Sequence, residues 1–347
     1  MRTLLRWLGR GLLAVLALIL LLLSPIAYVE TACRPQGQAA PYASILPKAD
    51  HRPESRMLMT YPEWHIVHAY DDYARVIRDG DPHDYGFLRG IGGFWSSLCV
   101  LSKASGAHGG FDGGTKQMVY VIGTSFTLEL ALKAAYEETL GRAATWIRGA
   151  AHAVTDDISA RQAADYAAFL RQTPWYRWDF RRDAAELQGA GDSFRDHERA
   201  TALGLEYGAK ASYAKMIEAA VANVGPDALR LKMVVTGLPD GFLAAHPDVT
   251  LIETRPEGSV IETPRYAALT KLLAEMAAGG ADFVEIAGND DIMFTATSDQ
   301  PEQAGALTSM ARQGYGDYRH LMAVKVADLA DRLRDLGPLR LEHIHDY

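Results

Sequence analysis

The sequence predicts an N-terminal transmembrane helix, then a mainly α-helical domain, then a C-terminal α+β domain. Three observations support this fold class. Residues 11–29 carry no charged side chain. Apolar residues recur at helical spacing over residues 60–225, where some motifs occur twice. Over residues 226–347, short runs rich in Val, Ile and Thr alternate with helical patterns.

The composition is that of a folded protein and argues against one class of partner. The chain has 347 residues, of which 48% are hydrophobic and 22% charged, enough for two domains with cores of their own. Its formal net charge is −8, so it has no broad basic surface to hold a phosphate backbone. Nucleic-acid binding is not expected.

Residues 1–30 predict the membrane anchor. The charge-free stretch of residues 11–29 matches the roughly 20 residues needed to cross a bilayer. Arg2, Arg6 and Arg10 precede it, which predicts a cytoplasmic N-terminus and a periplasmic location for the bulk of the chain. The alternative is a cleaved signal peptide, since residues 12–23 have the length of its apolar core, but no A-x-A-like cleavage site follows closely.

Residues 31–59 predict a Pro-rich tether that lifts the folded part off the membrane. The segment contains four prolines and little periodicity. It also holds Cys33, and the second cysteine of the chain is Cys99, in an apolar helical run. The two could pair in an oxidising compartment, although a buried, reduced Cys99 is the simpler expectation.

The first helix of the helical domain is predicted to begin at Thr60. Thr60 and Glu63 have the spacing of a capping box, in which each residue satisfies a free backbone N–H of the first turn. Pro62 would lie in that turn, where a missing N–H costs nothing.

Two segments of the helical domain resemble each other, residues 72–142 and residues 165–220. The first contains "DYARVIR" and "LELALKAAYEE", and the second contains "DYAAFLR" and "LEYGAKASYAK". We therefore predict a tandem duplication of two helices. Its first copy would be longer by the glycine-rich loop of residues 103–118.

The repeated motif places a glutamate, a lysine and a tyrosine on one stripe of each helix, because positions i, i+4 and i+7 share a face. The six residues are Glu129, Lys133, Tyr136, Glu206, Lys210 and Tyr213. They would form either exposed ion pairs or a network that pairs the two copies. As a pair of acid and base, Glu129 and Glu206 would suit a glycosidase-like hydrolase. The adjacent lysines argue against that role, because they favour charged carboxylates.

The C-terminal region predicts a ferredoxin-like domain, since its elements follow the order β-α-β-β-α-β. Strands are expected at residues 248–255, 282–288, 292–298 and 339–345, with residues 231–238 as an extra strand. Helices are expected at residues 265–280 and 317–337. A tight turn at Asn289 and Asp290 would join the two central strands as a hairpin.

Two groups of histidines are candidates for a metal site. His65 and His68 are spaced i, i+3 on a helix, with Glu63 nearby, and His343 and His345 would share one side of a strand. If the two elements met, several imidazoles would converge; otherwise these are ordinary, partly buried histidines. A second candidate uses Glu285 and the oxygens of residues 288–292 for a hard cation, although a turn needs the same residues.

Aromatic residues give a weaker indication of a binding surface. Trp95 and Trp175 lie in the helical domain and could line an apolar groove, although most such residues belong to cores.

The stretches "TYPEWHIVHAYDDYA" (residues 60–74) and "GTSFTLELALKAAYEETLGR" (residues 123–142) resemble uncharacterised bacterial proteins with an N-terminal membrane anchor. The resemblance implies a bacterial inner-membrane setting. It implies no activity, cofactor or catalytic residue.

These patterns together predict a single-pass protein of the bacterial inner membrane, held in the bilayer through residues 11–29. Its expected function is that of a non-catalytic periplasmic binding or assembly factor whose helical domain holds an apolar ligand or a membrane protein partner. The alternative is a metal-dependent periplasmic enzyme that uses His65, His68 and Glu63. No nucleophile motif, phosphate-binding motif or cofactor pattern occurs in the sequence.

Overall fold

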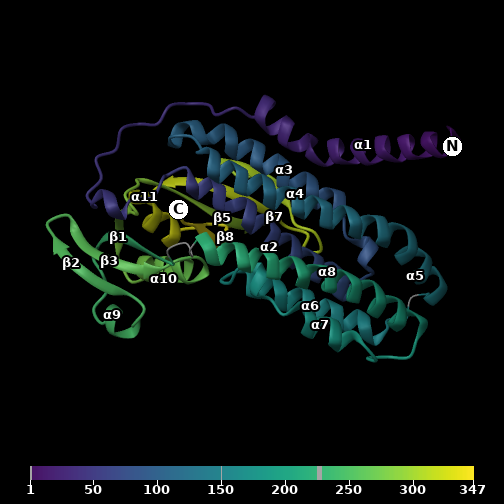
Figure 1. Cartoon of the computed structure of the whole chain (residues 1–347). Coiled ribbons are helices and arrows are strands. Elements are labelled where there is room, and N and C mark those ends of the chain that lie inside the picture. The colour runs from purple at the N-terminus through teal and green to yellow at the C-terminus, as the bar shows by residue number, and fades with distance from the viewer. Residues whose placement is uncertain (1, 150, 225–228) are drawn as a thin grey trace.

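The computed structural model describes residues 2–149, 151–224 and 229–347. Helix α1 (Arg2–Ala32) extends from a bundle of helices, and the bundle joins a region of sheets at its other end (Figure 1). The part of α1 from Gly9 to Ala32 is long and apolar enough to cross a membrane, with a mean hydropathy of 2.8 and only 6% of its most apolar window buried. The predicted boundary at residues 225–226 lies outside the described residues.

The bundle is built from seven α-helices of very different lengths. They are α2 (Arg56–Asp79), α3 (Phe87–Ala104), α4 (Gly113–Tyr136), α5 (Arg142–Arg148), α6 (Val154–Leu170), α7 (Phe180–Leu187) and α8 (Phe194–Val224). A π-helical turn (Glu137–Gly141) joins α4 to α5, so the two form one long rod. The α5 end of this rod and the N-terminus of α1 lie at the same end of the molecule (Figure 1).

Helix α2 begins at Arg56, so the predicted start at Thr60 is wrong. The residues before Thr60 are apolar, and Met57 and Leu58 are fully buried. They pack with Tyr61 into the hydrophobic core of the sheet region. Because these side chains are buried, the helix begins before the predicted cap at Thr60, and Pro62 lies inside the helix. The two predicted domains consequently share a core.

The two similar segments of the bundle contain the same order of elements. The first has α2, a 3₁₀ turn (Pro82–Asp84), α3 and α4, and the second has α6, a 3₁₀ turn (Trp175–Arg177), α7 and α8. Helix α3 has 18 residues and α7 has 8, so the extra length of the first segment lies mainly in α3. The predicted inserted loop of residues 103–118 is instead the end of α3, a 3₁₀ turn and the start of α4.

Equivalent aromatic residues also cluster in both segments. Tyr73, Tyr85 and Phe87 have ring centres 5.1–6.1 Å apart. Tyr166 lies 5.4 Å from Trp178 and 5.5 Å from Phe180, at the same sequence spacing. Helices α2 and α6, which carry these clusters, pack along each other. A common origin of the two segments stays a prediction.

The sheet region consists of two four-stranded antiparallel sheets in place of the predicted single sheet. The strands are β1 (Arg230–Thr236), β2 (Thr250–Arg255), β3 (Gly258–Pro264), β4 (Asp282–Ile286), β5 (Asp291–Ser298), β6 (Ala306–Ala311), β7 (Tyr318–Lys325) and β8 (Arg340–His345). Their orders are β2-β3-β1-β4 and β6-β7-β5-β8. Strands β4 and β5 lie in different sheets, so Asn289 and Asp290 do not form the predicted hairpin turn.

The two halves of the sheet region share one topology. Each half runs strand, strand, strand, helix, strand, with the long helices α10 (Ala267–Ala278) and α11 (Val326–Arg334); a short helix, α9 (Phe242–Ala245), lies between β1 and β2. In each sheet the second strand in sequence is at one edge and the fourth at the other. Helices α10 and α11 pack against each other, and α11 packs on β4 of the other half.

The segment between α1 and α2, which is predicted to be a tether, contacts the folded part at several points. Cys33 forms a disulfide with Cys99 of α3, which also overturns the expectation of a reduced Cys99. Farther along, residues 42–46 dock on the carboxylate of Glu285 in β4, which is fully buried. Glu285 accepts hydrogen bonds from Tyr42, Ser44, Ile45 and Leu46 at 2.6–3.0 Å.

These four hydrogen bonds also decide the role of Glu285. We call residues 33–55, between α1 and α2, the strapping segment. Backbone N–H and hydroxyl donors of this segment bind both carboxylate oxygens of Glu285. The structure therefore gives Glu285 a structural partner within the protein, in place of the hard cation considered from the sequence.

Candidate functional site

The charged residues of the repeated motif meet between α4 and α8. Lys210 Nζ lies 2.7 Å from Glu129 Oε1 and 2.9 Å from Glu206 Oε1. Lys133 Nζ lies 3.2 Å from Glu206 Oε1. The glutamate of each segment thus contacts the lysine of the other segment, and all four side chains are 11–26% exposed. Long polar side chains, more than close backbone packing, join the two helices here.

The tyrosines of the motif do not enter this network. Tyr136 donates a hydrogen bond to Glu198, and the Tyr213 ring stacks on Trp175 with centres 5.3 Å apart. Tyr70 of α2 enters in their place: its hydroxyl donates to Glu129 and accepts from Lys210 Nζ at 2.7 Å. Tyr70 precedes Tyr73 by about one helical turn, so the two tyrosines share a face of α2.

Aromatic rings surround both lysines at equivalent places. Lys133 Nζ lies 4.6 Å from the ring centre of Tyr73, and Lys210 Nζ lies 5.7 Å from that of Tyr166. Both distances are within the range of cation–π attraction. The rings replace part of the hydration that each ammonium group loses on burial.

The lysines of this network hold Glu206 in its charged form. Burial by itself would raise the pKa of Glu206, but Lys133 and Lys210 lower it to about 2. Burial would likewise lower the pKa of Lys210, and the charges of Glu129 and Glu206 instead raise it well above its usual value. Near neutral pH Glu206 carries no proton to donate. Glu129 and Glu206 are both engaged by Lys210 in ion pairs.

A cavity beside the network is too small for an organic ligand. Its volume is about 20 Å³, which is room for about one water molecule. Tyrosines, phenylalanine and tryptophan line it together with Lys133, Glu206 and Lys210. The polar groups of the network therefore hold the bundle together, and this cavity provides no binding pocket for an apolar molecule.

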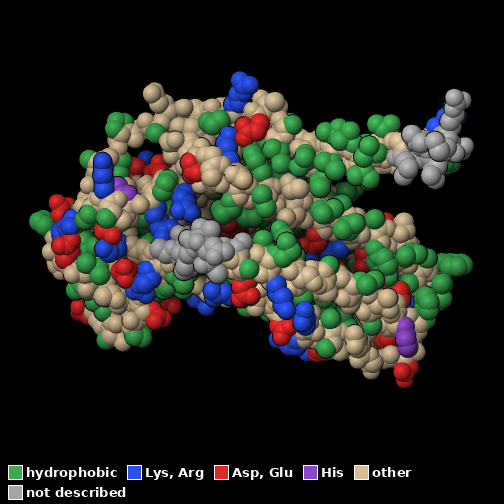
Figure 2. Space-filling view, in the orientation of Figure 1, with side chains coloured by type: hydrophobic (Ala, Val, Ile, Leu, Met, Phe, Trp, Pro, Cys, Tyr) green, Lys and Arg blue, Asp and Glu red, His purple; other side chains and the backbone are tan. Residues whose placement is uncertain are grey.

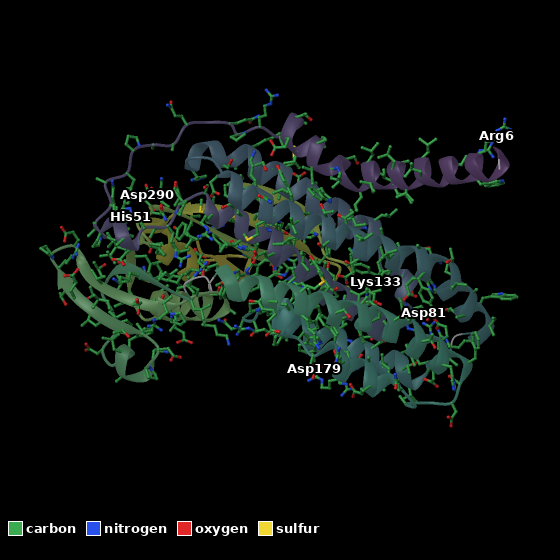
Figure 3. All side chains as sticks on the ribbon, viewed as in Figure 1. Arg6, His51, Asp81, Lys133, Asp179 and Asp290 are labelled. Carbon is green, nitrogen blue, oxygen red and sulfur yellow. A yellow bond between two sulfur atoms is a disulfide. The ribbon has the colours of Figure 1, made fainter. Side chains whose placement is uncertain are left out.

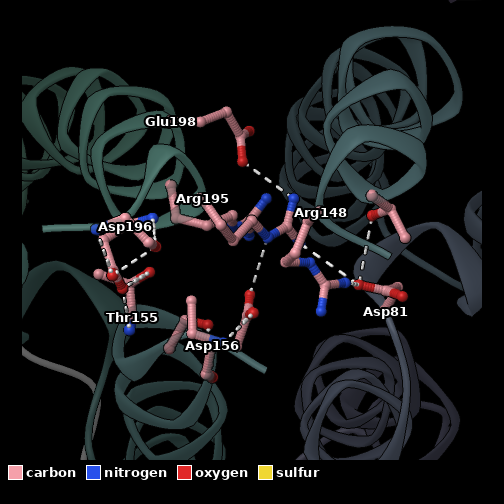
Figure 4. A network of polar contacts seen from close by, with 12 residues as sticks. Asp81, Arg148, Thr155, Asp156, Arg195, Asp196 and Glu198 are labelled. Atoms are coloured by element: carbon pink, nitrogen blue, oxygen red, sulfur yellow. Dashed lines mark hydrogen bonds and ion pairs between the residues drawn. The ribbon is translucent and has the colours of Figure 1, made fainter. Parts of the chain in front are cut away.

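A second group of buried charges continues toward the α5 end of the bundle (Figure 4). Arg195 is 1% exposed and contacts Asp156 at 3.1 Å and Glu198 at 2.9 Å. Asp81, labelled near the α5 end of the bundle in Figure 3, accepts a hydrogen bond from Arg148 of α5 and lies 3.6 Å from Arg195. The interior of the bundle is thus unusually polar. Removing one partner of such a pair leaves an uncompensated buried charge, so the contacts specify which helices pair.

The histidines of α2 and β8 lie together at the junction of the bundle and the sheets. The ring of His343 stacks on Trp64 with centres 3.4 Å apart and lies 4.8 Å from the ring of His345. His68 Nε2 is 3.5 Å from a carboxylate oxygen of Glu342, and His65 Nε2 is 3.0 Å from the carbonyl oxygen of Gly90.

This arrangement does not bring the predicted metal ligands to one point. Glu63 is exposed, whereas His65 and His68 are buried. Within residues 2–149, 151–224 and 229–347, the groups of three possible metal ligands lie elsewhere. Burial lowers the pKa of His65 to about 4 and that of His345 to about 3, so both imidazoles are neutral at pH 7.

The two tryptophans considered as binding residues have structural neighbours. Trp95 is 5% exposed, and its indole N–H donates to the Thr127 hydroxyl at 2.8 Å. Trp175 is partly buried against Tyr213 and Phe180. Trp95 belongs to the core of the bundle.

Outside α1, large apolar side chains are also exposed along the long rod formed by α4 and α5. Met118, Val121, Leu128 and Leu132 recur at helical spacing along α4. Leu132 is 64% exposed, and Trp146 of α5 is 85% exposed. The full set is Met118, Val121, Leu128, Leu132, Leu140, Trp146 and Ile147. Residues Gly113 to Arg148 are long and apolar enough to cross a membrane, with only 28% of their most apolar window buried.

A groove of about 650 Å³ lies between this rod and α1. Leu23 and Ile26 line it from α1, and Tyr120 and Val121 from α4. Glu30 lies at the groove too, where it binds Lys116 at 3.0 Å and Tyr120 at 2.6 Å. Hydrophobic side chains gather along α1 and the neighbouring part of the bundle, whereas charged side chains crowd the sheet end (Figure 2).

Comparisons of the chain with protein-family models, curated proteins and solved structures find no match.

Proposed function

We propose that the protein is a non-catalytic binding factor of the bacterial inner membrane whose helical bundle docks on the periplasmic leaflet. In this proposal α1 crosses the bilayer with its N-terminus in the cytoplasm. The rod formed by α4 and α5, which runs beside α1, contacts the bilayer through its exposed apolar side chains, and the apolar partner of the helical region is membrane lipid.

The exposed apolar face of the rod carries this proposal. Soluble proteins rarely expose so many large apolar side chains along one helical rod. Moving each of them from water into lipid stabilises the docked state by roughly 1 kcal/mol or more. Because α1 already holds the bundle at the bilayer, docking does not have to offset the full loss of translational freedom.

The direction of the rod agrees with this placement. The α5 end and the N-terminus of α1 lie at the same end of the molecule, so a bilayer that surrounds α1 also approaches α5 (Figure 1). Trp146 is at that end, and tryptophan is typical of the interface between lipid and water. The charged sheet end points away, toward the aqueous side (Figure 2).

The disulfide supports the export of the folded part. Bonded cysteines such as Cys33 and Cys99 are typical of the periplasm and rare in the cytoplasm. The bond also ties the last turn of α1 to α3, so the anchor and the bundle are held close together. The bundle is therefore placed at the membrane surface in this proposal.

The two similar segments of the bundle, in this proposal, arose by duplication. Support comes from the recurring element order, the equivalent aromatic clusters and the cross-paired Glu129–Lys210 and Lys133–Glu206 contacts. Pairing related helices around shared polar contacts lets the interior fix the bundle while the outer face of α4 stays apolar.

Photo-crosslinking in native membranes tests lipid binding. A photoreactive benzoyl-phenylalanine replaces Val121 in the groove or Leu132 on the rod, with Glu302 in the sheet region as an exposed control. We expect phospholipid adducts at positions 121 and 132 and none at 302, as detected by mass spectrometry. Equal labelling at all three positions would contradict the proposal. Adducts with another protein in place of lipid would also contradict it and would identify a protein partner.

The alternative of a metal-dependent enzyme at His65, His68 and Glu63 has no supporting observation, because the three side chains do not face one point.

A further inference from the structure

Three possible metal ligands meet where the strapping segment, the bundle and the sheets come together. Glu54 lies just before α2, His108 lies in the 3₁₀ turn after α3 (Ser105–His108), and Asp291 is the first residue of β5. His108 Nδ1 is 3.1 Å from Glu54 Oε2 and 3.6 Å from Asp291 Oδ2. One ligand atom of each residue lies within 4.8 Å of the others.

These distances suit a tetrahedral zinc ion. With metal–ligand bonds of about 2.0–2.2 Å, two ligands of a tetrahedral site are about 3.3–3.6 Å apart. The two distances from His108 Nδ1 lie close to that range. The three side chains are 13–19% exposed, so they are held by the protein yet open to solvent on one side. A water molecule would complete the coordination.

The surrounding contacts hold the carboxylates in place. The second oxygen of Glu54 accepts a hydrogen bond from the backbone N–H of Asp291 at 3.2 Å. Lys325 Nζ binds Asp291 at 2.8 Å and Asp290 at 2.9 Å. A carboxylate oriented by an outer contact, as Glu54 is by the Asp291 N–H, binds a metal more tightly. Lys325 instead contacts the ligand oxygen of Asp291 and competes with a bound cation. The Lys325 side chain is 49% exposed, so it can turn into solvent when a cation binds.

We propose that Glu54, His108 and Asp291 form a zinc site that clamps the bundle to the sheet region. The imidazole nitrogen favours Zn²⁺ over Mg²⁺ and Ca²⁺, which prefer oxygen ligands alone. The two carboxylates balance the charge of the ion. The inference is independent of the lipid docking proposed above, because these residues lie on other elements. Without a metal, the same contacts are explained by a hydrogen bond between His108 Nδ1 and Glu54 Oε2, with Asp291 nearby.

Zinc titration of the full-length chain in detergent distinguishes the two explanations. The protein is stripped with EDTA, dialysed and titrated with Zn²⁺ in competition with a chromogenic chelator. We expect one bound equivalent per chain and no competition by excess Ca²⁺. His108→Ala and Asp291→Asn should each weaken binding at least 10-fold, whereas His197→Ala, at an exposed position on α8, should not change it.

Lys325→Met provides a test that does not remove a ligand. It deletes the competing cation, so zinc should bind several-fold more tightly. X-ray absorption of the loaded wild-type protein should show nitrogen and oxygen ligands, including one imidazole. Less than 0.1 equivalent of zinc bound by the wild type, or binding unchanged in His108→Ala, would overturn the proposal.

Discussion

Lowering the pH from 7 to 5 should destabilise the fold through the buried histidines that join α2 to β8. Burial lowers the pKa of His65 to about 4 and that of His345 to about 3, whereas imidazoles in the unfolded chain titrate near 6.5. Unfolding in acid therefore takes up protons. The contribution of these histidines to stability is full above pH 6.5 and is lost as the pH falls toward the folded pKa values.

The size of the effect follows from these pKa values. Each histidine loses about 1.4 kcal/mol of stabilisation per pH unit below 6.5, or about 2 kcal/mol at pH 5. Asp72 acts in the opposite direction: burial raises its pKa to about 6, and its protonation returns about 1.4 kcal/mol at pH 5. The net loss is about 3 kcal/mol. Burial also lowers the pKa of His68 and of His343, which increases the loss.

Urea unfolding of the full-length chain in detergent, followed by tryptophan fluorescence at pH 7, 6 and 5, measures this loss. His345→Asn should reduce the slope by about 1.4 kcal/mol per pH unit. The exposed His197→Asn should leave it unchanged. A free energy of unfolding that stays constant or rises between pH 7 and pH 5 would refute the reasoning.

Three further substitutions test the contacts that hold the fold. Lys210→Met should lower the free energy of unfolding in urea by about 3–5 kcal/mol, because the carboxylates of Glu129 and Glu206 lose a cation. Adding Glu129→Gln should recover part of that loss, and purely additive losses would argue against direct pairing. Cys33→Ser should lower the free energy of unfolding by about 4 kcal/mol, because it releases a loop that spans 66 residues. An unchanged midpoint temperature of thermal unfolding would contradict this. Glu285→Gln should expose residues 42–46 to limited proteolysis, and wild-type cleavage rates would show that the strap is held elsewhere.

The polar network shows what a repeated motif can and cannot predict. The spacing of Glu129 and Lys133, repeated at Glu206 and Lys210, placed each pair on one stripe of a helix, and the structure shows these four side chains meeting. Helical spacing sets which residues share a face, so this part depends on local geometry alone. The entry of Tyr70 depends on how α2 packs across the two helices, which no local pattern specifies.

The sheet region shows where local patterns fail. The sequence predicts a helix over residues 317–337, because no break separates residues 318–325 from the apolar pattern of α11. In the structure residues 318–325 form β7. Strands β3 and β6 were missed, since half-exposed strands lack a clear alternation of burial. Without those two strands, the sequence predicts a single ferredoxin-like sheet. The structure instead has two sheets with equivalent strand orders.

The docking of the strapping segment and the pairing of the cysteines could not be predicted, for another reason. The four prolines of residues 31–59 correctly exclude a long helix over most of the segment, but they do not exclude docking. Its partners, Glu285 and Cys99, lie far away in sequence. Contacts at that distance follow from the completed fold.

The depth of residue 146 in a bilayer tests lipid docking most directly. Because both native cysteines are bonded, a single cysteine introduced at Trp146 can be labelled with the fluorophore NBD, with Glu302→Cys as the control. The full-length chain is reconstituted in phospholipid vesicles that contain acyl-chain spin labels. Blue-shifted emission and strong quenching at position 146, with neither at 302, are the results expected for a rod that contacts the bilayer. Emission at 146 typical of water, with quenching no stronger than at 302, would place the rod outside the membrane.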